Sequence, residues 1–281
     1  MMEQKLNGKK IKLIALDMDG TLLNSCKSLT HRNYEAIDQA IKRGIHVIPA
    51  TGRPISGLPE KLVSHPKIQY AICSNGAAIV NLDSKRAIYN CSVTKEMAIS
   101  IIELLSPLDI MIDIFADGKI TTEAKNMKRL EDFIIPSNML PYILDTRYTV
   151  EDIKEYIKNG AENIEKINMF FRDEIQRRKV IAELSDYPNI LLSSALGVNL
   201  EVNNAKANKG HGIQWLSQYL KIDMEETMAC GDSSNDESML RTVGLAVAMG
   251  NSTVDIKSIA DYITGTNDED GVAEAIEAFI L

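Results

Sequence analysis

Residues 17–22, with the sequence Asp-Met-Asp-Gly-Thr-Leu, follow directly on the apolar run of residues 11–16. A continuous apolar run that ends in an acid predicts a strand, here residues 11–17, that is buried on both faces. The carboxylates of Asp17 and Asp19 leave that strand together, and Gly20 permits a sharp turn after them. The stretch therefore predicts a buried strand that carries acidic groups at its carboxyl end.

Strand-like and helix-like segments alternate on both sides of this stretch. A helix is predicted at residues 30–43, with Thr30 as its N-cap and Gly44 as its C-terminal stop. Strands that alternate with helices imply crossover connections and a mostly parallel sheet. The further predictions are strands at 45–50, 70–73, 227–230 and 245–248, and helices at 209–220 and near Glu237. The predicted fold class is α/β, with a Rossmann-like, mostly parallel sheet as its core.

The middle of the chain, residues 84–203, has a different texture. It predicts longer amphipathic helices between strands near residues 109–115 and 164–171. A hairpin of residues 190–194 and 198–202 is expected to turn near Leu196 and Gly197. We therefore expect a core of residues 1–83 and 204–281, interrupted by an inserted α+β domain of residues 84–203.

The composition is that of an ordinary globular protein, with 45% hydrophobic and 25% charged residues among 281. A net charge of -8 argues against a general nucleic-acid binder and against docking on an anionic membrane. The four cysteines are far apart, which favours reduced thiols over disulfides or a zinc site. No apolar run approaches the roughly 20 residues of a membrane span. We expect a cytoplasmic protein with no nucleic-acid or membrane partner.

Four short polar motifs stand where predicted strands end or a helix begins. In an open parallel sheet, ligands bind at the carboxyl ends of the strands. Each motif alone has a common structural explanation, because turn acids, N-caps and solvated lysines are frequent. Together they favour a functional site. The motifs are residues 17–22, 50–54 (Ala-Thr-Gly-Arg-Pro), 208–210 (Asn-Lys-Gly) and 231–236 (Gly-Asp-Ser-Ser-Asn-Asp).

The acids of the first and last motifs predict a magnesium site. Two carboxylates about 4 Å apart repel by roughly 4 kcal/mol at an effective dielectric constant near 20. If Asp17, Asp19 and Asp232 converge, a bound cation relieves that repulsion. Oxygen ligands without His or Cys nearby favour Mg²⁺.

The remaining groups predict phosphoryl transfer. Lys209, Thr51 and backbone N–H groups are left to bind phosphate oxygens, on the side of the site away from the metal. An aspartate such as Asp17 is ionised at neutral pH and can attack phosphorus without a base. Asp19 is placed to protonate the leaving oxygen and then to activate water.

In this order and spacing, the four motifs resemble those of the haloacid dehalogenase (HAD) superfamily. More closely they resemble its Cof-type phosphatases, which carry a large α+β cap of the C2 type between the second and third motifs. The resemblance covers nearly the whole chain, although Asn204 and Lys206 stand where such proteins often have proline and glycine. It implies a Mg²⁺-dependent phosphatase of sugar phosphates or phosphorylated cofactors, with an aspartyl-phosphate intermediate on Asp17 and a cap that sets substrate specificity.

The resemblance also implies roles for single residues. Asp17 matches the nucleophile, Asp19 the general acid/base, and Asp232 a metal ligand; Asp17 and the Asp19 carbonyl complete the metal ligands. The remaining matches are the phosphate contacts Met18 (through its backbone), Thr51, Gly52, Lys209 and Asn235, the acid Asp236 that holds metal-bound water, and the possible substrate contacts Arg53 and Asn75.

Two other functions stay open at this point. A phosphomutase of the phosphomannomutase type would share the nucleophile but return phosphate to a sugar. A non-catalytic phosphate-binding or regulatory module on the same fold would use Asp17 and Mg²⁺ without turnover. The expected partner is a small phosphorylated metabolite, and the sequence leaves open whether the protein is a monomer or a homodimer.

Overall fold

The computed structural model of the protein describes residues 10–194 and 196–281, and the chain divides into two compact units. The first unit consists of Met1–Gly52, Leu58–Ile88 and Asn208–Leu281, and the second of Arg53–Gly57 and Tyr89–Ala207. The chain therefore leaves the first unit twice, after Gly52 and after Ile88.

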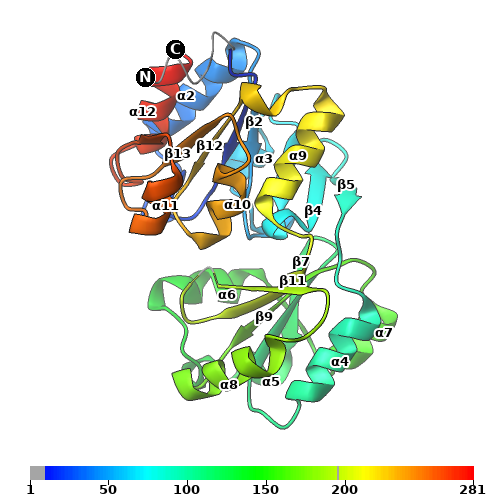
Figure 1. Cartoon of the computed structure of the whole chain (residues 1–281). Helices are drawn as coiled ribbons and strands as arrows, with labels where there is room; N and C mark the ends of the chain where they lie inside the picture. The colour runs from blue at the N-terminus through cyan, green and yellow to red at the C-terminus, as the bar shows by residue number, and fades with distance from the viewer. Residues whose placement is uncertain (1–9, 195) are drawn as a thin grey trace. The chain divides into compact units, whose positions relative to one another are not determined.

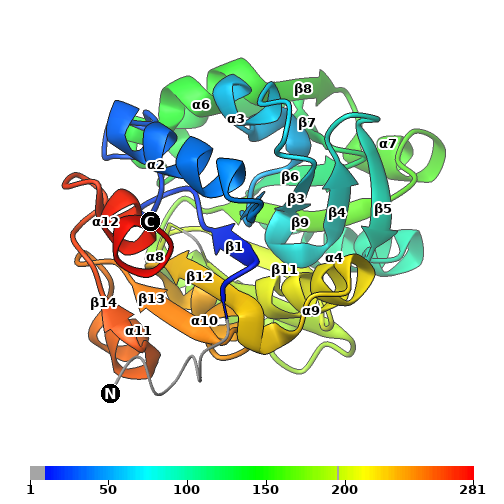
Figure 2. The same ribbon diagram turned by 90° about the horizontal axis from the view of Figure 1, so that it is seen from above.

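A five-stranded sheet forms the centre of the first unit, in the order β14-β13-β12-β1-β2, and all its neighbouring strands are parallel. Strands β14, β13, β12 and β1 are labelled in Figure 2. The central strand β1 is buried along its whole length, which confirms the predicted strand and the predicted parallel core. Short apolar strands covered on both faces are typical of parallel sheets. The strands are β1 (Leu13–Leu16), β2 (His46–Pro49), β12 (Thr227–Gly231), β13 (Leu245–Ala248) and β14 (Tyr262–Ile263).

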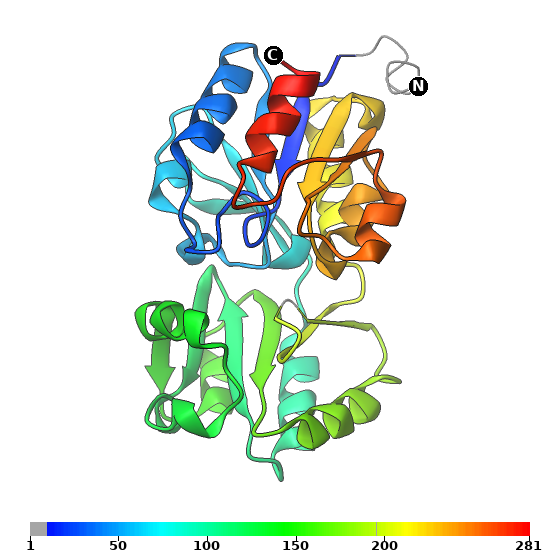
Figure 3. The ribbon, with the colours of Figure 1, turned by 90° about the vertical axis from the view of Figure 1, so that its left-hand side faces the viewer.

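The three helices predicted in the first unit, which correspond to α2, α9 and α10, lie close to the predicted positions. The Thr30 hydroxyl accepts a hydrogen bond from the Asn33 N–H and so caps α2, and Gly44 adopts a positive φ of 84° just beyond the helix. Helices α2 and α12, from opposite ends of the chain, pack side by side (Figures 1 and 3). The helices are α2 (His31–Lys42), α3 (Glu60–Val63), α9 (Lys209–Leu220), α10 (Glu237–Leu240), α11 (Val254–Ile259) and α12 (Gly271–Phe279).

The predicted strand at residues 70–73 exists but does not extend the parallel sheet in the expected way. As β3 (Tyr70–Cys73) it pairs antiparallel with β4 (Ala78–Asn81), in a separate three-stranded sheet that ends with β5 (Arg86–Asn90). A single parallel bridge between Ala50 and Ile72 links β3 to the end of β2. The tight turn at residues 74–77 returns the chain at once, so no crossover helix can follow β3.

The second unit is built on a six-stranded sheet in the order β10-β11-β9-β6-β7-β8. Its neighbours are antiparallel except for the parallel pair β7 and β8. The antiparallel pair β10 and β11 confirms the predicted hairpin; Gly197 in its turn has a φ of 72°, and Ala195 lies outside the described residues. The strands are β6 (Met111–Ala116), β7 (Lys119–Glu123), β8 (Arg147–Val150), β9 (Ile164–Phe170), β10 (Ile190–Ser193) and β11 (Leu200–Asn204).

Two apolar clusters stabilise the second unit. The larger joins one face of the sheet to α4, α7 and α8, and a smaller one gathers around Met111 and Phe170. Burial of this kind contributes about 25 cal/mol per Å² of apolar surface. The helices are α4 (Lys95–Leu105), α5 (Ala124–Met127), α6 (Leu140–Thr146), α7 (Ile153–Asn159) and α8 (Glu174–Leu184).

Candidate active site

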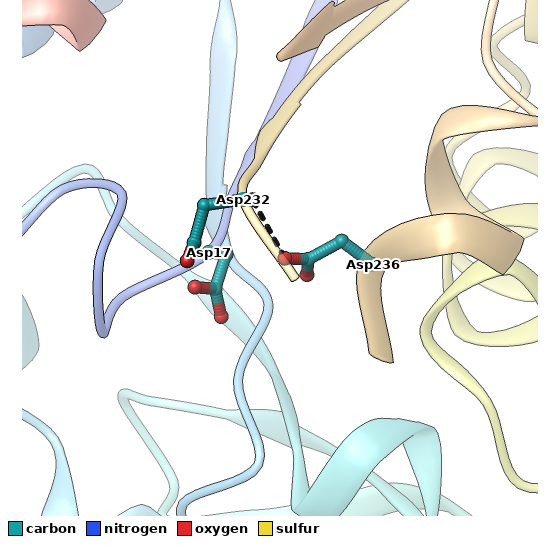
Figure 4. A group of neighbouring side chains, drawn as sticks. All are labelled: Asp17, Asp232 and Asp236. Carbon is teal, nitrogen blue, oxygen red and sulfur yellow. Dashed lines mark hydrogen bonds between the residues drawn. The ribbon is translucent and has the colours of Figure 1, made fainter. Parts of the chain in front are cut away.

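The carboxyl ends of β1 and β12 place two acids side by side. Leu16 pairs with Cys230 in the parallel register, and the Asp17 N–H continues the ladder by donating to the Cys230 carbonyl at 3.1 Å. Asp17 follows β1 directly and is buried; Asp232 follows β12 directly. Because the two strands are neighbours and parallel, both carboxylates leave the sheet at the same edge (Figure 4).

The turn after Asp17 is shaped by Gly20. This residue has a φ of 86°, and a Cβ atom there would lie 2.5 Å from Asp232 Oδ2, so a larger residue would both strain the backbone and displace the acid. The next residue, Thr21, donates its hydroxyl to Asp232 Oδ1 at 2.9 Å. The first motif thus positions its own acid and that of the fourth motif.

Lys209 is the first residue of α9 and is fully buried. Its ammonium lies 2.5 Å from Asp17 Oδ1 and 2.6 Å from Asp236 Oδ1. The following Gly210 lets α9 approach α10 closely, because a Cβ atom there would lie 2.3 Å from the Ser238 carbonyl oxygen. The Lys-Gly pair therefore brings a cation between two acids from different elements.

Asp236 is the last residue of a short 3-10 helix, Ser234–Asp236, and its carboxylate is held by hydrogen bonds. Its Oδ2 accepts hydrogen bonds from the backbone N–H groups of Asp232 at 2.9 Å and Ser233 at 3.1 Å, the first of which is drawn in Figure 4. Gly231 leaves room for it, since a Cβ atom there would lie 2.6 Å from Asp236 Cβ. The carboxylate of Asp236 thus fixes the loop that carries Asp232.

Within residues 10–194 and 196–281, one group of three acids is close enough to hold a metal ion, namely Asp17, Asp232 and Asp236, with one oxygen of each within 4.8 Å of the others. Three carboxylates face the single ammonium of Lys209, which leaves two formal negative charges. Burial and the charges of Asp236 and Asp232 hold the pKa of Asp17 well above its usual value, although Lys209 acts in the opposite direction. Burial and Asp236 likewise raise the pKa of Asp232 to about 6.

The lysine responds in the complementary way. Burial alone would lower the pKa of Lys209, but the carboxylates of Asp17 and Asp236 outweigh burial and raise that pKa. The ammonium is therefore stabilised while the acids carry excess charge. An oxygen-only group with two uncompensated negative charges fits a divalent cation such as Mg²⁺.

Asp19 is not among these three acids. Its Oδ1 pairs with Lys27 Nζ at 2.8 Å, and both side chains are about one-third exposed, at 36% and 32%. The backbone of Met18 closes the turn between the two acids, since the Met18 carbonyl accepts from the Leu23 N–H at 2.8 Å.

The second motif reaches the fourth through Asn75. Thr51 is buried beyond β2, and its carbonyl accepts a hydrogen bond from the Asn75 N–H at 2.9 Å. The Asn75 side-chain carbonyl in turn accepts from Asn235 Nδ2 at 3.3 Å. Gly52 follows Thr51 as the last residue of the first unit before the chain departs.

Arg53, predicted as a possible substrate contact, belongs to the second unit. Its guanidinium donates to the Gly57 carbonyl at 2.9 Å and stands 4.9 Å from the ring centroid of Tyr142. These contacts fit an anchoring role within the second unit.

Four further residues contribute to the site, and of these Lys27 was not singled out from the sequence. Thr21 and Lys27 bind the acids as described above. Asn251 donates to the Gly20 carbonyl at 2.8 Å, and Asn267 to the Leu23 carbonyl at 3.0 Å, so two late loops brace the first motif. Thr21 lies inside the first motif. Lys27 is a loop residue with a φ of 59°, and sequence patterns do not reveal the loop conformation on which its contact with Asp19 depends.

Among the described residues, none of the helices combines the length and apolar character that a membrane crossing requires.

Comparison with known proteins gives a consistent result. The family model for haloacid dehalogenase-like hydrolases matches residues 14–276. The phosphatase YwpJ of Bacillus subtilis is 32% identical over 286 residues, covering 95% of this chain and 99% of the relative. The 5-amino-6-(5-phospho-D-ribitylamino)uracil phosphatase YcsE of the same organism is 32% identical over 275 residues, covering 96% of each chain.

A solved structure agrees with this likeness. A haloacid dehalogenase-like hydrolase from B. subtilis superposes with a TM-score of 0.83 at 29% identity, covering 96% of this chain and all of that one. Sequence and fold are therefore similar over nearly the whole length, second unit included.

Proposed function

This chain belongs to the haloacid dehalogenase-like hydrolases and is a phosphatase by its relatives, and on that premise we propose that it hydrolyses small phosphomonoesters through an aspartyl-phosphate on Asp17, with Mg²⁺. One observation supports this most: three carboxylates converge, and two of them, those of Asp17 and Asp236, are buried and pair with the buried ammonium of Lys209. The excess of negative charge suits a cation, and the cation and lysine together suit a phosphate.

In the proposed first step, an oxygen of Asp17 attacks phosphorus and the bond from phosphorus to the alcohol oxygen breaks. Asp19 gives its proton to that oxygen as it leaves. In the second step, Asp19 takes a proton from water, the water oxygen attacks phosphorus, and the bond to Asp17 breaks. The products are the alcohol, inorganic phosphate and the restored carboxylate of Asp17.

The metal would be held by Asp17, Asp232 and the Asp19 carbonyl, and it would neutralise charge on the transferring phosphoryl group. Asp236 has both oxygens engaged by Lys209 and backbone N–H groups, so we assign it to holding the loop and the lysine. Lys209, Thr51, Gly52, Asn235 and the Met18 backbone would bind the phosphate oxygens.

The ion pair of Asp19 with Lys27 adds a condition to this mechanism. An acid bonded to a lysine cannot at the same moment protonate a leaving oxygen. Asp19 must therefore exchange Lys27 for the substrate, a rotation that its partial exposure allows.

We further propose that the second unit is the cap that sets substrate specificity. One relative is named for 5-amino-6-(5-phospho-D-ribitylamino)uracil, a phosphate ester that contains a polyol chain. That ester belongs in any substrate panel for this protein, beside simple sugar phosphates.

The test is release of inorganic phosphate from such a panel, with and without Mg²⁺, by the natural protein and by Asp17→Asn. We expect Mg²⁺-dependent release that disappears in the variant, and an acid-stable, hydroxylamine-sensitive phosphate on the natural protein. Full activity in Asp17→Asn would overturn the mechanism. Phosphate transfer that depends on an added sugar bisphosphate, with little free phosphate, would favour the mutase.

A further inference from the structure

A tight turn of residues 24–28 places Lys27 next to Asp19. Lys27 has a φ of 59°, in the left-handed region that side chains other than those of Asn and Asp seldom adopt. The turn is closed at three points: the Lys27 N–H donates to the Asn24 carbonyl at 2.8 Å, the Asn24 N–H to the Ser28 carbonyl at 3.1 Å, and the Ser28 N–H to Asn24 Oδ1 at 2.9 Å. Strained residues persist only where their surroundings fix them, and they gather at functional sites.

The backbone of this loop is also fixed from outside. The Ser25 N–H and hydroxyl both donate to the carboxylate of Asp268, at 2.8 Å and 2.6 Å, and Asn267 donates to the Leu23 carbonyl at 3.0 Å. The side chain of Lys27 is less restricted, since it is 32% exposed. The loop therefore presents a mobile ammonium on a fixed support.

The ion pair between Lys27 and Asp19 is not needed to close the loop. The two residues are eight positions apart, and their Nζ and Oδ1 atoms lie 2.8 Å from each other. Between them, Leu23 already forms backbone bridges with both Asp19 and Leu29. The loop thus has backbone closure of its own, and the contact of the two side chains calls for another explanation.

The charges of the site supply that explanation. The three converging acids and the buried lysine already leave two formal negative charges uncompensated. If Asp19 turned toward these acids before a cation and a phosphate had bound, its carboxylate would add a third negative charge to them. The pair with Lys27 gives Asp19 a favourable orientation that avoids this repulsion.

The pair is also weak enough to be broken by a substrate. Its two side chains are about one-third exposed, and ion pairs that water reaches contribute little free energy. The pair of Lys209 with Asp17, in contrast, is buried and is expected to stay closed. Lys27 can therefore release Asp19 while the buried charges keep their places.

We propose that Lys27 is a positioning residue, which holds Asp19 in an idle orientation in the ligand-free protein and releases it to the leaving oxygen once a phosphate ester is bound. This inference rests on the proposed phosphatase function. Lys27 acts through Asp19 and does not touch the ester. Because the ester must break the ion pair before it receives a proton, Lys27 slows the first step for an alcohol that cannot leave without that proton.

The kinetic test compares hexyl phosphate, whose alkoxide needs a proton to leave, with 4-nitrophenyl phosphate, whose phenolate leaves without one. The measured quantity is the ratio of their kcat/KM values, which excludes the later hydrolysis of the aspartyl-phosphate that both esters share. In Lys27→Met this ratio of the hexyl to the nitrophenyl ester should rise about two- to fivefold, the factor that an exposed ion pair supplies. Damage to the loop would not raise it.

Two further variants serve as controls for this measurement. Lys27→Arg keeps the cation and should keep the ratio of the natural protein. Lys42→Met removes another exposed ion pair of the first unit, that with Asp38 at 2.6 Å on α2, and should leave the ratio unchanged. If the ratio stays the same or falls in folded Lys27→Met, Lys27 does not hold Asp19 back.

A structural measurement separates this inference from the phosphatase proposal. In crystals of the natural protein without ligand, the ion pair should be closed; with Mg²⁺ and orthovanadate, an analogue of the transferring phosphoryl group, Asp19 and Lys27 should be more than about 4 Å apart, beyond ion-pair distance. If neither ester is hydrolysed, the proposed function fails, and these two structures alone decide the inference. A pair that stays closed with vanadate, or is open without it, overturns the inference and leaves the phosphatase proposal standing wherever the esters are hydrolysed.

Discussion

Replacing Asp17 by asparagine should abolish turnover and, in the same protein, raise the stability of the metal-free fold. Asparagine keeps the size of the side chain and removes one of three converging charges. The raised pKa of Asp17 leads to the same expectation, because it means that the folded state disfavours the ionised form relative to the unfolded chain. At neutral pH, above the unfolded value near 3.9, that charge therefore lowers the free energy of unfolding.

The distances give the size of the effect. At an effective dielectric constant of 20, a carboxylate oxygen at most 4.8 Å away repels Asp17 by at least about 3.5 kcal/mol, and the Lys209 ammonium at 2.5 Å attracts it by about 6.6 kcal/mol. The two repulsions together offset the one attraction. What remains in the natural protein is the cost of removing the Asp17 carboxylate from water, several kcal/mol, and Asp17→Asn does not bear that cost. The variant also loses the charge-assisted hydrogen bond between Lys209 and Asp17, which reduces its gain in stability by about 1.5–3 kcal/mol. We expect a net gain of about 1–3 kcal/mol.

The assay is thermal unfolding followed by circular dichroism, first in EDTA and then in Mg²⁺. Asp17→Asn should melt several degrees above the natural protein in EDTA, at about 2–4 °C per kcal/mol. Mg²⁺ should reduce the difference in melting temperature between the two proteins, because a ligand that binds only the folded state stabilises the natural protein by mass action. Asp83→Asn, an exposed control in the same unit, should change neither. A variant that melts at or below the natural protein in EDTA would refute the charge argument.

Three further predictions concern the metal, the helix contact and pH. Asp232→Asn should raise the Mg²⁺ concentration needed for half-maximal activity at least tenfold; an unchanged titration would remove Asp232 from the metal ligands. Gly210→Ala should destabilise the protein by about 1–3 kcal/mol in urea denaturation, because the new Cβ atom would clash with the Ser238 carbonyl oxygen. A variant as stable as the natural protein would show that α10 can move to make room for it. Partial burial lowers the pKa of His46, so the unfolded chain binds the extra proton first, and stability should fall as the pH drops below about 6.5. His46→Gln should flatten that slope, and an equal slope in both proteins would contradict the assignment.

Much of the first unit could be predicted because its signals are local. The strand before Asp17, the Thr30 cap and the helix that starts at Lys209 each follow from a short run of residues, and the structure has them at or within two residues of the predicted positions. Parallel pairing then brings the strand ends together without any further information. These short runs of residues do not predict the orientation of a side chain such as that of Asp19, which depends on its ion pair with the loop residue Lys27.

The second unit was harder to predict for the opposite reason. Strand β7 was not expected, although Asp117 and Gly118 form the two-residue turn between β6 and β7, with φ values of 52° and 76°, and Asp-Gly is a strong hairpin signal. The turn residues would have located the hairpin. Nothing as local marks the polar side chains that pair across this sheet, since they come from six strands and meet only through pairing; they are Thr149, Thr122, Asp113, Asn168, Glu201 and Ser193.

This contrast has a consequence for how the two units can change. The acids and the lysine of the first unit are tied to backbone N–H groups and to glycines at contact distance, so a substitution there disturbs several partners at once. On the sheet of the second unit, the buried side chains of Lys166 and Glu201 face neighbours on adjacent strands, and an exchange of the two would alter the hydrogen-bonding pattern while the strands keep their register. If the second unit sets substrate specificity, as proposed above, selectivity can shift by paired changes on its sheet while the phosphoryl-transfer chemistry stays as it is. Coupled substitution of Lys166 and Glu201 should therefore change the ranking of substrates more than the dependence on Mg²⁺.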